Sequence, residues 1–351
     1  MAATLNIFEP TISTVSKGIE GKLVLLHSNE RKLGKTYQAT RFPKPYYLRF
    51  EQGINAIAGL AYAPLKKWSD FKKINKQLTD PKTVEKARQM YSTIIVDTTD
   101  VAIKWCEKYV CASQGVTRLN DGNSGFGLWK EYENEWFNEW NKLLNAGYCV
   151  VFIAHSEVRK LKNPVTKEEY EQLYPKGDKR TIDLIIDAAD FIGYVKSNGF
   201  DENGELQMSS VYFSACPEFL AGSRFTYMAK EVTPFTAEGV QEAMKQAIEQ
   251  EEAEKGITAI SYDEKVAEET VEEISFEDAL RVAKIYGKVL VKVEKNKDNT
   301  PIKDKALAIL EKYLGEGAKL DEAIPEQVEQ VTLIMTELQE LAEEYDIEVE
   351  V

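Results

Sequence analysis

Short apolar segments alternate with longer amphipathic segments through the first 235 residues of the chain. The apolar segments are rich in β-branched and aromatic side chains and show little polar alternation, which is typical of strands buried on both faces of a sheet. They lie at residues 22–27, 46–50, 93–97, 149–154 and 191–195. The segments with helical spacing lie at residues 35–40, 68–78, 83–90, 101–111 and 128–144. Strands that alternate with helices pair in parallel through crossovers, so the pattern predicts an α/β fold with a mostly parallel central sheet.

The pattern changes after residue 235. An acid-rich amphipathic segment indicates a helix, and the stretch after it has many acids and few large apolar residues, as solvated linkers do. Three further helical segments follow, and Ser275 is placed to cap the first of them while Asp278 reaches back toward it. These four helical segments lie at residues 235–255, 275–287, 302–314 and 325–345. We therefore expect a core over residues 1–235, an acidic helix and linker over residues 236–274, and a small acidic helical module over residues 275–351.

The net charge of −14 is concentrated at one end of the chain. Residues 236–351 carry a net charge of −17, and residues 1–235 carry +3. No segment is long and apolar enough to span a membrane, and the first residues lack the basic and apolar regions of a signal peptide. We therefore expect a cytoplasmic protein without a membrane partner. The chain has two histidines and four cysteines without a CxxC pair, which argues against a zinc site or a disulfide framework.

The segment after the first apolar strand reads SNERKLGKT over residues 28–36. A phosphate-binding loop needs backbone N–H groups around the phosphates, a lysine that reaches the β and γ oxygens, and a hydroxyl for Mg²⁺ at the start of a helix. Lys35 and Thr36 fit the last two roles, which indicates ATP and Mg²⁺ as cofactors. The candidate nucleotide loop comprises Asn29, Glu30, Arg31, Lys32, Leu33, Gly34, Lys35 and Thr36.

This loop departs from the usual pattern GxxxxGK[ST] at its first position, where Asn29 replaces glycine. Asparagine tolerates a positive φ better than most side chains, so the turn stays feasible. A glycine is often found at position 32 as well, and this chain has Lys32. The alternative is an ordinary helix start, but the position between a buried strand and a helix favours a phosphate loop.

Three polar side chains follow other predicted strands, where α/β sheets place their ligand-binding groups. Asp97 ends TIIVD and is placed to hold the water shell of Mg²⁺, although Asp97 can also cap the next helix. Glu51 follows YYLRF and is placed to orient or deprotonate water, although a surface glutamate is the simpler interpretation. His155 follows CVVFIA and is placed to sense the γ-phosphate, although the alternative is a core histidine.

Taken together, these segments resemble the phage-encoded AAA-type nucleotide-binding proteins with a RecA-like core, a group that includes the phage single-strand annealing recombinases. The resemblance spans about residues 15–230 and rests on SNERKLGKT, PKPYYLRFEQGINAI, YSTIIVDTTD, DGNSGFGLWKEYENEW, CVVFIAHSE and GDKRTIDLIIDAADFIGYVKSNG. It implies a RecA-like P-loop NTPase core in which Glu51 is the catalytic glutamate, Asp97 the Walker B aspartate and His155 the sensor. It also implies the cytoplasm of a phage-infected or prophage-carrying bacterium as the location.

The resemblance extends to PEFLAGSRF at residues 217–225, where related ATPases carry basic residues that reach the nucleotide of a neighbouring subunit. This chain keeps Arg224 and has Gly222 at the earlier basic position. A guanidinium supplied in trans stabilises the charge of a phosphoryl transition state, which would require a homo-oligomer, either a ring or a filament. The alternative for Arg224 is a salt-bridged surface residue.

A charged segment between His155 and Thr181 combines basic and aromatic side chains. Positive charge binds phosphates without sequence preference, and aromatic rings stack on unpaired bases. The corresponding loop of RecA-like proteins lines the DNA axis, so the resemblance implies single-stranded DNA as a partner. The candidate DNA-binding residues are Arg159, Lys160, Lys162, Tyr170, Tyr174, Lys176, Lys179 and Arg180. Acids interspersed among them lower the local charge, and a solvated mixed-charge loop is the alternative.

The sequence therefore favours an ATP- and Mg²⁺-dependent RecA-like ATPase that oligomerises and acts on single-stranded DNA in recombination or annealing. The rival is a nucleotide-binding adaptor or scaffold with weak or no turnover that works through its helical C-terminal module. The divergent Asn29 and Lys32 favour this rival. The acidic tail either recruits a phage or host replication or recombination protein or keeps the chain soluble.

Overall fold

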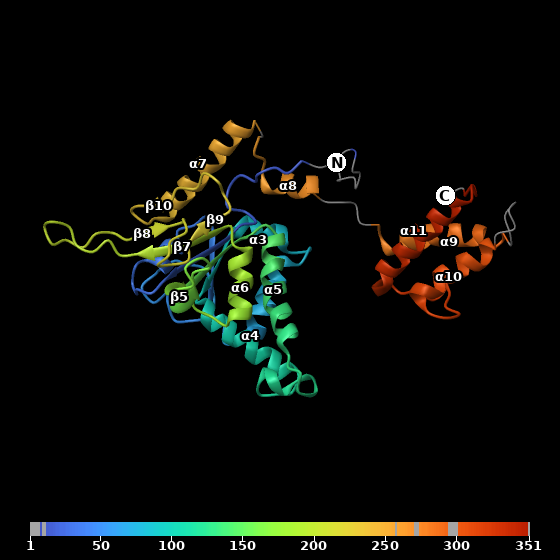
Figure 1. Cartoon of the computed structure of the whole chain (residues 1–351), viewed down its shortest axis with the longest axis horizontal. Helices are drawn as coiled ribbons and strands as arrows, with labels where there is room; N and C mark the ends of the chain where they lie inside the picture. The colour runs from blue at the N-terminus through green and yellow to red at the C-terminus, as the bar shows by residue number, and fades with distance from the viewer. Residues whose placement is uncertain (1–7, 9–11, 257, 270–273, 294–300, 350–351) are drawn as a thin grey trace. The chain divides into compact units, whose positions relative to one another are not determined.

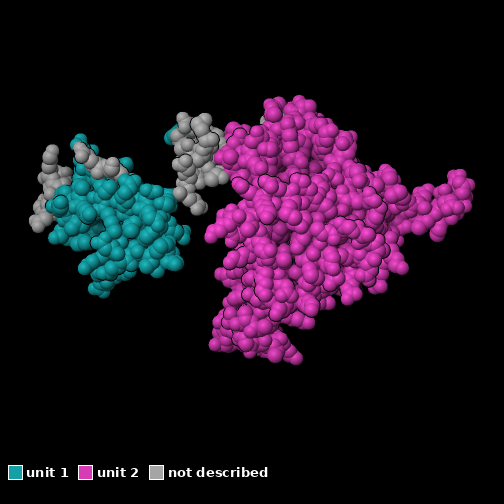
Figure 2. Space-filling model, turned by 180° about the vertical axis from the view of Figure 1, so that it is seen from behind, with its two compact units in different colours: residues 1–10, 270–351 teal, residues 11–269 magenta. Residues whose placement is uncertain are grey.

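The computed structural model describes residues 8, 12–256, 258–269, 274–293 and 301–349. The chain divides into two compact units (Figure 2), one formed by residues 11–269 and the other by residues 1–10 with 270–351. The first is called the core unit below, and the second is called the C-terminal unit.

The core unit is built on a central sheet (Figure 1). Its strand order is β10-β8-β7-β1-β5-β4-β2-β3. The parallel pairs involve β1 (Leu23–Ser28), β2 (Pro45–Arg49), β3 (Tyr62–Ala63), β4 (Thr93–Asp97), β5 (Cys149–Lys162) and β7 (Phe191–Lys196). The antiparallel pairs add β6 (Glu169–Pro175), β8 (Ser210–Tyr212), β9 (Gly222–Ser223) and β10 (Glu231–Val232). The structure therefore confirms the predicted α/β class and the mostly parallel central sheet.

Alternate side chains of each strand point to opposite faces of the sheet, so the apolar strands give the sheet two apolar faces. Helices cover both of these faces. Leu23 and Leu25 of β1 belong to one buried cluster, and Val24 and Leu26 belong to another. The first cluster packs under α2 (Trp68–Thr79), α3 (Val84–Met90), α4 (Thr99–Ser113), α5 (Trp129–Asn145) and α6 (Lys179–Ala188). The second packs under α1 (Lys35–Ala39) and α7 (Ala237–Lys255). Burial on both faces explains why the strands have continuous apolar sequences.

The strand order brings separate segments of the chain to one edge of the sheet. β5 lies between β1 and β4, with Ser28 opposite His155 and Asp97 opposite Ile153. β2 pairs with the other side of β4, with Arg49 opposite Asp97. Because these strands are parallel, the loops that follow them meet at the same edge.

The core unit extends past residue 235, where the sequence pattern placed its boundary. Val240, Met244 and Ile248 of α7 are buried in the second apolar cluster. The sequence predicted α7 as an acid-rich amphipathic helix outside the core. Its buried and exposed residues follow helical spacing, so its acids are compatible with docking on the sheet.

The stretch expected to be a solvated linker contains a docked helix, α8 (Tyr262–Glu269). The hydroxyl of Tyr262 donates to the backbone oxygens of Leu144 and Asn145 at 2.9 and 3.1 Å, which fixes α8 to the core unit. Sequence composition cannot show such a contact, because it rests on one aromatic side chain in an otherwise polar stretch. Residues 257 and 270–273 lie outside the described part of the chain.

The C-terminal unit packs α9 (Phe276–Leu290), α10 (Ile302–Leu314) and α11 (Val328–Glu344) around its own apolar cluster. The cluster includes Ala283, Leu290, Ile302, Ile334 and Leu338. Ser275 caps α9, since its Oγ accepts from the N–H of Asp278 at 3.0 Å, and the Asp278 carboxylate accepts from that hydroxyl at 2.8 Å. Short 3₁₀ turns at Leu320–Glu322 and Pro325–Gln327 precede α11.

Two β-hairpins extend from the sheet of the core unit. β5 continues past Ala154 and pairs with β6, whereas the sequence predicted a loop after residue 154. Solvent reaches both faces of this hairpin, which removes the apolar pattern that marks a buried strand. The second hairpin leaves the sheet after β7 and returns at β8 (Figure 1). A β-bridge joins Phe200 and Leu206 in it. Its residues 197–209 are called the arm below.

Within the described part of the chain, every helix falls short of the length or the apolar character that a membrane crossing requires.

Candidate nucleotide site

A cleft of about 580 Å³ lies at the carboxyl ends of β1 and β4, beside residues Ile153 to His155 of β5. It is lined by residues 30–37, which follow β1, and by Glu51, Asp97 and His155. Glu51 follows β2, Asp97 ends β4, and His155 lies within β5. Sequence reasoning selected these residues from four separate segments, and the structure brings them to one site. Asn29, the remaining residue of the candidate loop, does not line the cleft.

The nucleotide loop turns at Lys32 and Gly34, which have φ angles of 61° and 85°. A side chain at Gly34 would be strained at this φ, although the space where its Cβ would lie is open. The open space lets a ligand approach the backbone at this point. Asn29 does not use the positive φ that asparagine tolerates, since the described positive values in the loop belong to Lys32 and Gly34. Asn29 instead uses its side chain, as described below.

No side chain within the described loop caps the amino end of α1, which begins at Lys35. Its first N–H groups are therefore available to an acceptor outside the helix. The amine of Lys35 lies 3.4 Å from the backbone oxygen of Glu30. Burial lowers the pKa of Lys35, and the nearby Asp97 and Glu30 carboxylates oppose this effect. A phosphate group in the cleft would add negative charge and favour the charged amine.

Asp97 is the most buried acid of the cleft, with 3% of its surface exposed. Its Oδ2 accepts hydrogen bonds from Thr36 Oγ1 at 2.7 Å and from the Tyr47 hydroxyl at 2.9 Å. Burial raises the pKa of Asp97, while the bonds from Thr36 and Tyr47 oppose the rise. Burial beside Asp97 also raises the pKa of Tyr47, so this phenol stays neutral and acts as a donor.

Tyr47 and Gly53 complete the surroundings of Asp97 and were missed by sequence reasoning. A Cβ at Gly53 would lie 2.8 Å from the Tyr47 hydroxyl and 3.2 Å from Asp97 Oδ2, so no side chain fits there. Tyr47 lies inside an apolar strand, where its sequence context indicates packing only. The signal that could have found it is a tyrosine in a strand that neighbours an acid-terminated strand.

The donor set fits Mg²⁺ bound together with a nucleotide. In the described residues, no group of three or more His, Cys, Asp or Glu side chains is arranged to hold a metal ion. The cleft offers the hydroxyl of Thr36 and the carboxylate of Asp97, which are already in contact. Mg²⁺ usually takes one or two protein oxygens, several waters and the phosphates of a substrate, and this pair is sufficient for that role.

Glu51 is held next to Asp97 by its backbone and by its side chain. Its N–H donates to the backbone oxygen of Asp97 at 3.1 Å, and its Oε2 accepts from Thr98 Oγ1 at 3.0 Å. The side chain is exposed on the wall of the cleft. Glu51 is therefore positioned by the residues that end β4, and one of its carboxylate oxygens remains for a water molecule.

His155 lies where the buried part of β5 gives way to the hairpin. It pairs in register with Ser28, the residue that precedes the nucleotide loop. Its Nδ1 lies 3.3 Å from Asp100 Oδ1, and its side chain is 41% exposed, so it is not a core histidine. The N–H of Lys176, on the return of the hairpin, donates to the backbone oxygen of His155 at 2.8 Å. His155 thus connects the cleft with both ends of the hairpin.

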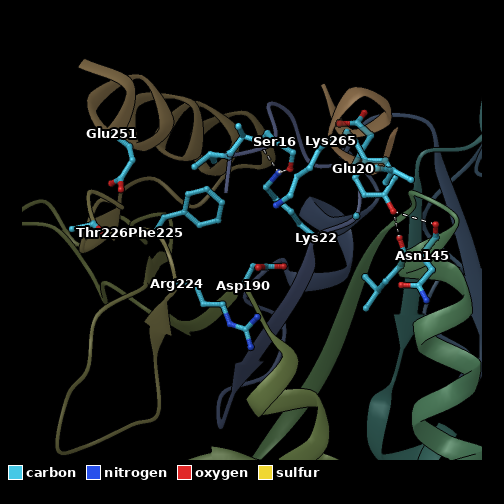
Figure 3. A pocket seen from close by; sticks show the side chains of 16 residues that line it. Ser16, Glu20, Lys22, Asn145, Asp190, Arg224, Phe225, Thr226, Glu251 and Lys265 are labelled. Carbon is cyan, nitrogen blue, oxygen red and sulfur yellow. Dashed lines mark hydrogen bonds between the residues drawn. The ribbon is translucent and has the colours of Figure 1, made fainter. Parts of the chain in front are cut away.

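Arg224 lies at the other end of the sheet, in a separate pocket of about 560 Å³ (Figure 3). This pocket also contains Lys22 and Asp190, and Asp190 accepts from the N–H of Leu23 at the amino end of β1. Arg224 donates to the backbone oxygen of Asp187. The structure therefore does not bring Arg224 to the cleft of its own chain, and its role in trans stays a prediction.

The candidate DNA-binding residues lie mainly on the β5–β6 hairpin, where acids balance their charge. Lys160 faces Glu171 across the strands, and Lys162 faces Glu169. Tyr170 is 38% exposed and remains accessible for stacking.

Two arginines of this set are engaged within the core unit. Arg159 lies 3.0 Å from Asp183 and 4.7 Å from the ring of Tyr174. Arg180 lies 2.9 Å from Glu133 and 4.8 Å from the ring of Trp129. By contrast, Lys176 and Lys179 are exposed at the base of the hairpin and at the start of α6.

The chain is similar to a known domain family and to a prophage protein. Residues 24–225, which contain the whole cleft, match a family described as AAA domain. The chain is 41% identical over 340 residues to the SPbeta prophage-derived uncharacterized protein YorG of Bacillus subtilis, covering 97% of this chain and 99% of that protein. The flagellar accessory protein FlaH from Methanocaldococcus jannaschii is 12% identical, with a TM-score of 0.27 over 55% of this chain and 85% of that chain. That likeness is too low to support an inference. The extent of the family match and the similarity to the prophage protein show that the chain belongs to this family of AAA domains.

Proposed function

We propose that this protein is a Mg²⁺-dependent ATPase with a RecA-like P-loop core. The observation that carries the proposal is the contact of 2.7 Å between Thr36 and Asp97, with Lys35 and Glu51 on the walls of the same cleft. A hydroxyl, a buried carboxylate, an amine and a second carboxylate are the groups that phosphoryl transfer to water requires.

Each side chain has a distinct task in this proposal. Lys35 and the free N–H groups at the start of α1 would bind the phosphate oxygens. Mg²⁺, when bound, neutralises phosphate charge, and Thr36 and Asp97 would hold it directly and through water, respectively. Glu51 would orient the attacking water and accept its proton, with Thr98 fixing the carboxylate. Water then bonds to the γ-phosphorus, the bond to the bridging oxygen breaks, and ADP and phosphate leave.

We further propose that the protein oligomerises and acts on single-stranded DNA in recombination or annealing. The support is the position of the β5–β6 hairpin, which begins beside His155. A structural change that His155 undergoes when the γ-phosphate is lost could therefore pass directly to Tyr170 and the exposed lysines. Arg224 is exposed and far from its own cleft, which suits a role on the nucleotide of a neighbouring subunit. The similarity to a prophage protein supports a phage origin and action in the bacterial cytoplasm.

The balanced charge of the hairpin makes the nucleic-acid interaction weak and sensitive to salt. Lys160 and Lys162 each face a glutamate, so a phosphate competes with an existing partner for each amine. The C-terminal unit, with its acidic surface, is the part that would recruit a replication or recombination protein.

The second candidate is a nucleotide-binding adaptor with little turnover. The divergence of the loop at Asn29 and Lys32 favours it, as does a C-terminal unit with its own apolar core. Phosphate release with Mg²⁺ and ATP, with and without single-stranded DNA at two salt concentrations, separates the two candidates. DNA-stimulated turnover that falls at high salt and is lost in Glu51→Gln supports the ATPase. Tight ATP binding without turnover in either condition would overturn it in favour of the adaptor.

A further inference from the structure

β7 and the base of the arm contact the nucleotide loop at three places. The Tyr194 hydroxyl donates to Asn29 Oδ1 at 2.6 Å. The N–H of Ser197 donates to the carboxylate of Glu30 at 3.2 Å, and the hydroxyl of Ser209 donates to the backbone oxygen of Leu33 at 3.0 Å. The loop is therefore held at its start and near its end by residues that follow it by about 165 to 176 positions.

The end of β7 and the base of the arm form a fixed support rather than a loose loop. The side-chain amide of Asn198 donates to the backbone oxygen of Met208 at 2.6 Å and to Ser210 Oγ at 2.9 Å, which ties the two strands of the arm together. The ring of Tyr194 stacks on Phe219 with centroids 4.2 Å apart and an angle of 13°. The hydroxyl that reaches Asn29 is thus held by a packed ring.

These contacts explain how the loop keeps its shape with side chains where the usual pattern has glycine. Asn29 does not use a left-handed conformation; its carboxamide accepts from Tyr194 instead. An asparagine at this position gains a partner that glycine cannot have. The loop is therefore adapted to the arm, and the departure from the pattern need not mean a loss of binding.

We propose that Tyr194 is a positioning residue for nucleotide binding, which acts through Asn29 and together with Ser209 holds the loop in its binding conformation. The proposal rests on the proposed function, since it concerns affinity at the same cleft. A loop that spends less time in this conformation binds nucleotide more weakly in proportion. Phe200 and Leu206, farther along the arm, are each 71% exposed.

The test is Tyr194→Phe in the full chain, which removes one hydroxyl and keeps the stacked ring. The Kd of a fluorescent ATP analogue with Mg²⁺, the KM and kcat for ATP, and the Tm are measured. We expect Kd and KM to rise about three- to tenfold with kcat unchanged, because one hydrogen bond of ordinary strength is lost. Tyr212→Phe is the matched control, since Tyr212 pairs with Tyr194 across β7 and β8. It should leave Kd and KM unchanged.

A double-mutant cycle with Asn29→Gly separates positioning from folding. This variant restores the glycine of the usual pattern, and the proposal predicts weaker binding because the acceptor for Tyr194 is gone. Tyr194→Phe should then add no further loss in the Asn29→Gly chain, since the two changes remove the same bond. A general loss of stability would instead make the effects additive and lower both Tm and kcat.

Each outcome decides between the proposals. Unchanged Kd and KM in Tyr194→Phe, with normal binding by the unaltered chain, would overturn the positioning role and leave the proposed ATPase intact. Stronger binding in Asn29→Gly would overturn it in the same way. An unaltered chain that binds no nucleotide would overturn the proposed function and this inference together.

Discussion

His27 is the residue through which acid should destabilise the core unit. The ring is fully buried, with Nδ1 2.9 Å from Ser156 Oγ and Nε2 2.6 Å from the backbone oxygen of Leu220. Because a carbonyl only accepts, Nε2 carries the proton of the neutral ring and Nδ1 accepts from Ser156. Burial lowers the pKa of His27 from 6.5 to about 4; the Leu220 carbonyl opposes this, and the charge of Lys35 adds to it.

The direction of the pH dependence follows from these two values. The unfolded chain binds the proton near pH 6.5 and the folded chain near pH 4, so the unfolded state holds more protons between them. The contribution of His27 to stability is complete above pH 6.5 and is lost as the pH falls toward 4. The full difference corresponds to about 3 kcal/mol, of which about 2 kcal/mol is lost between about pH 7 and pH 5.

Tryptophan fluorescence follows this loss in the core unit alone. The five tryptophans lie between residues 68 and 140, within that unit. Urea unfolding of the unaltered chain and of His27→Gln, each at two pH values of about 7 and 5, gives the free energies of unfolding. We expect the unaltered chain to lose about 2 kcal/mol more than the variant. An equal loss in the two proteins would refute the assignment of a buried, neutral His27.

Three further predictions concern the cleft and the C-terminal unit. Burial raises the pKa of Asp97, so the charge of this carboxylate opposes folding once the pH rises through the raised pKa. Asp97→Asn should therefore have a higher Tm than the unaltered chain at pH about 8, and the difference in Tm should be smaller in acid. A lower Tm of the variant at both pH values would contradict this. Glu51→Gln should retain ATP binding and lower kcat by about 100-fold or more in a phosphate-release assay, and normal turnover would remove Glu51 from the mechanism. Removal of residues 270–351 deletes 10 basic and 20 acidic residues, a net charge of −10, and should tighten single-stranded DNA binding at low salt but not at high salt. Equal affinity at low salt in a fluorescence anisotropy titration would show that the C-terminal unit does not screen the DNA surface.

The sequence predicted the parts of the structure that depend on local pattern. The buried strands are continuous apolar runs, so their positions and their parallel pairing follow from spacing alone. The convergence of Lys35, Asp97 and Glu51 follows as well, since each lies at or just after the carboxyl end of such a strand. The exposed β5–β6 hairpin was missed because solvent on both faces leaves no apolar period.

The features that the sequence did not predict depend on pairs of residues that are distant in the sequence. Tyr194 and Asn29 are 165 residues apart, and Tyr47 and Asp97 are 50 apart. Each tyrosine looks like a packing residue in its own strand, and its partner is fixed only by strand order and register. The role of α7 was obscured by its acids, because composition does not show which face of a helix is buried.

The central claim is that the loop after β1 binds the phosphates of ATP through Lys35. Calorimetric titration of the full chain with ATP and Mg²⁺, in parallel with Lys35→Ala, tests it most directly. The account predicts one site per chain in the unaltered protein and an affinity lower by about tenfold or more in the variant, because a charge-assisted contact to phosphate is lost. Equal affinity in the two proteins, or no binding by the unaltered chain, would contradict the account.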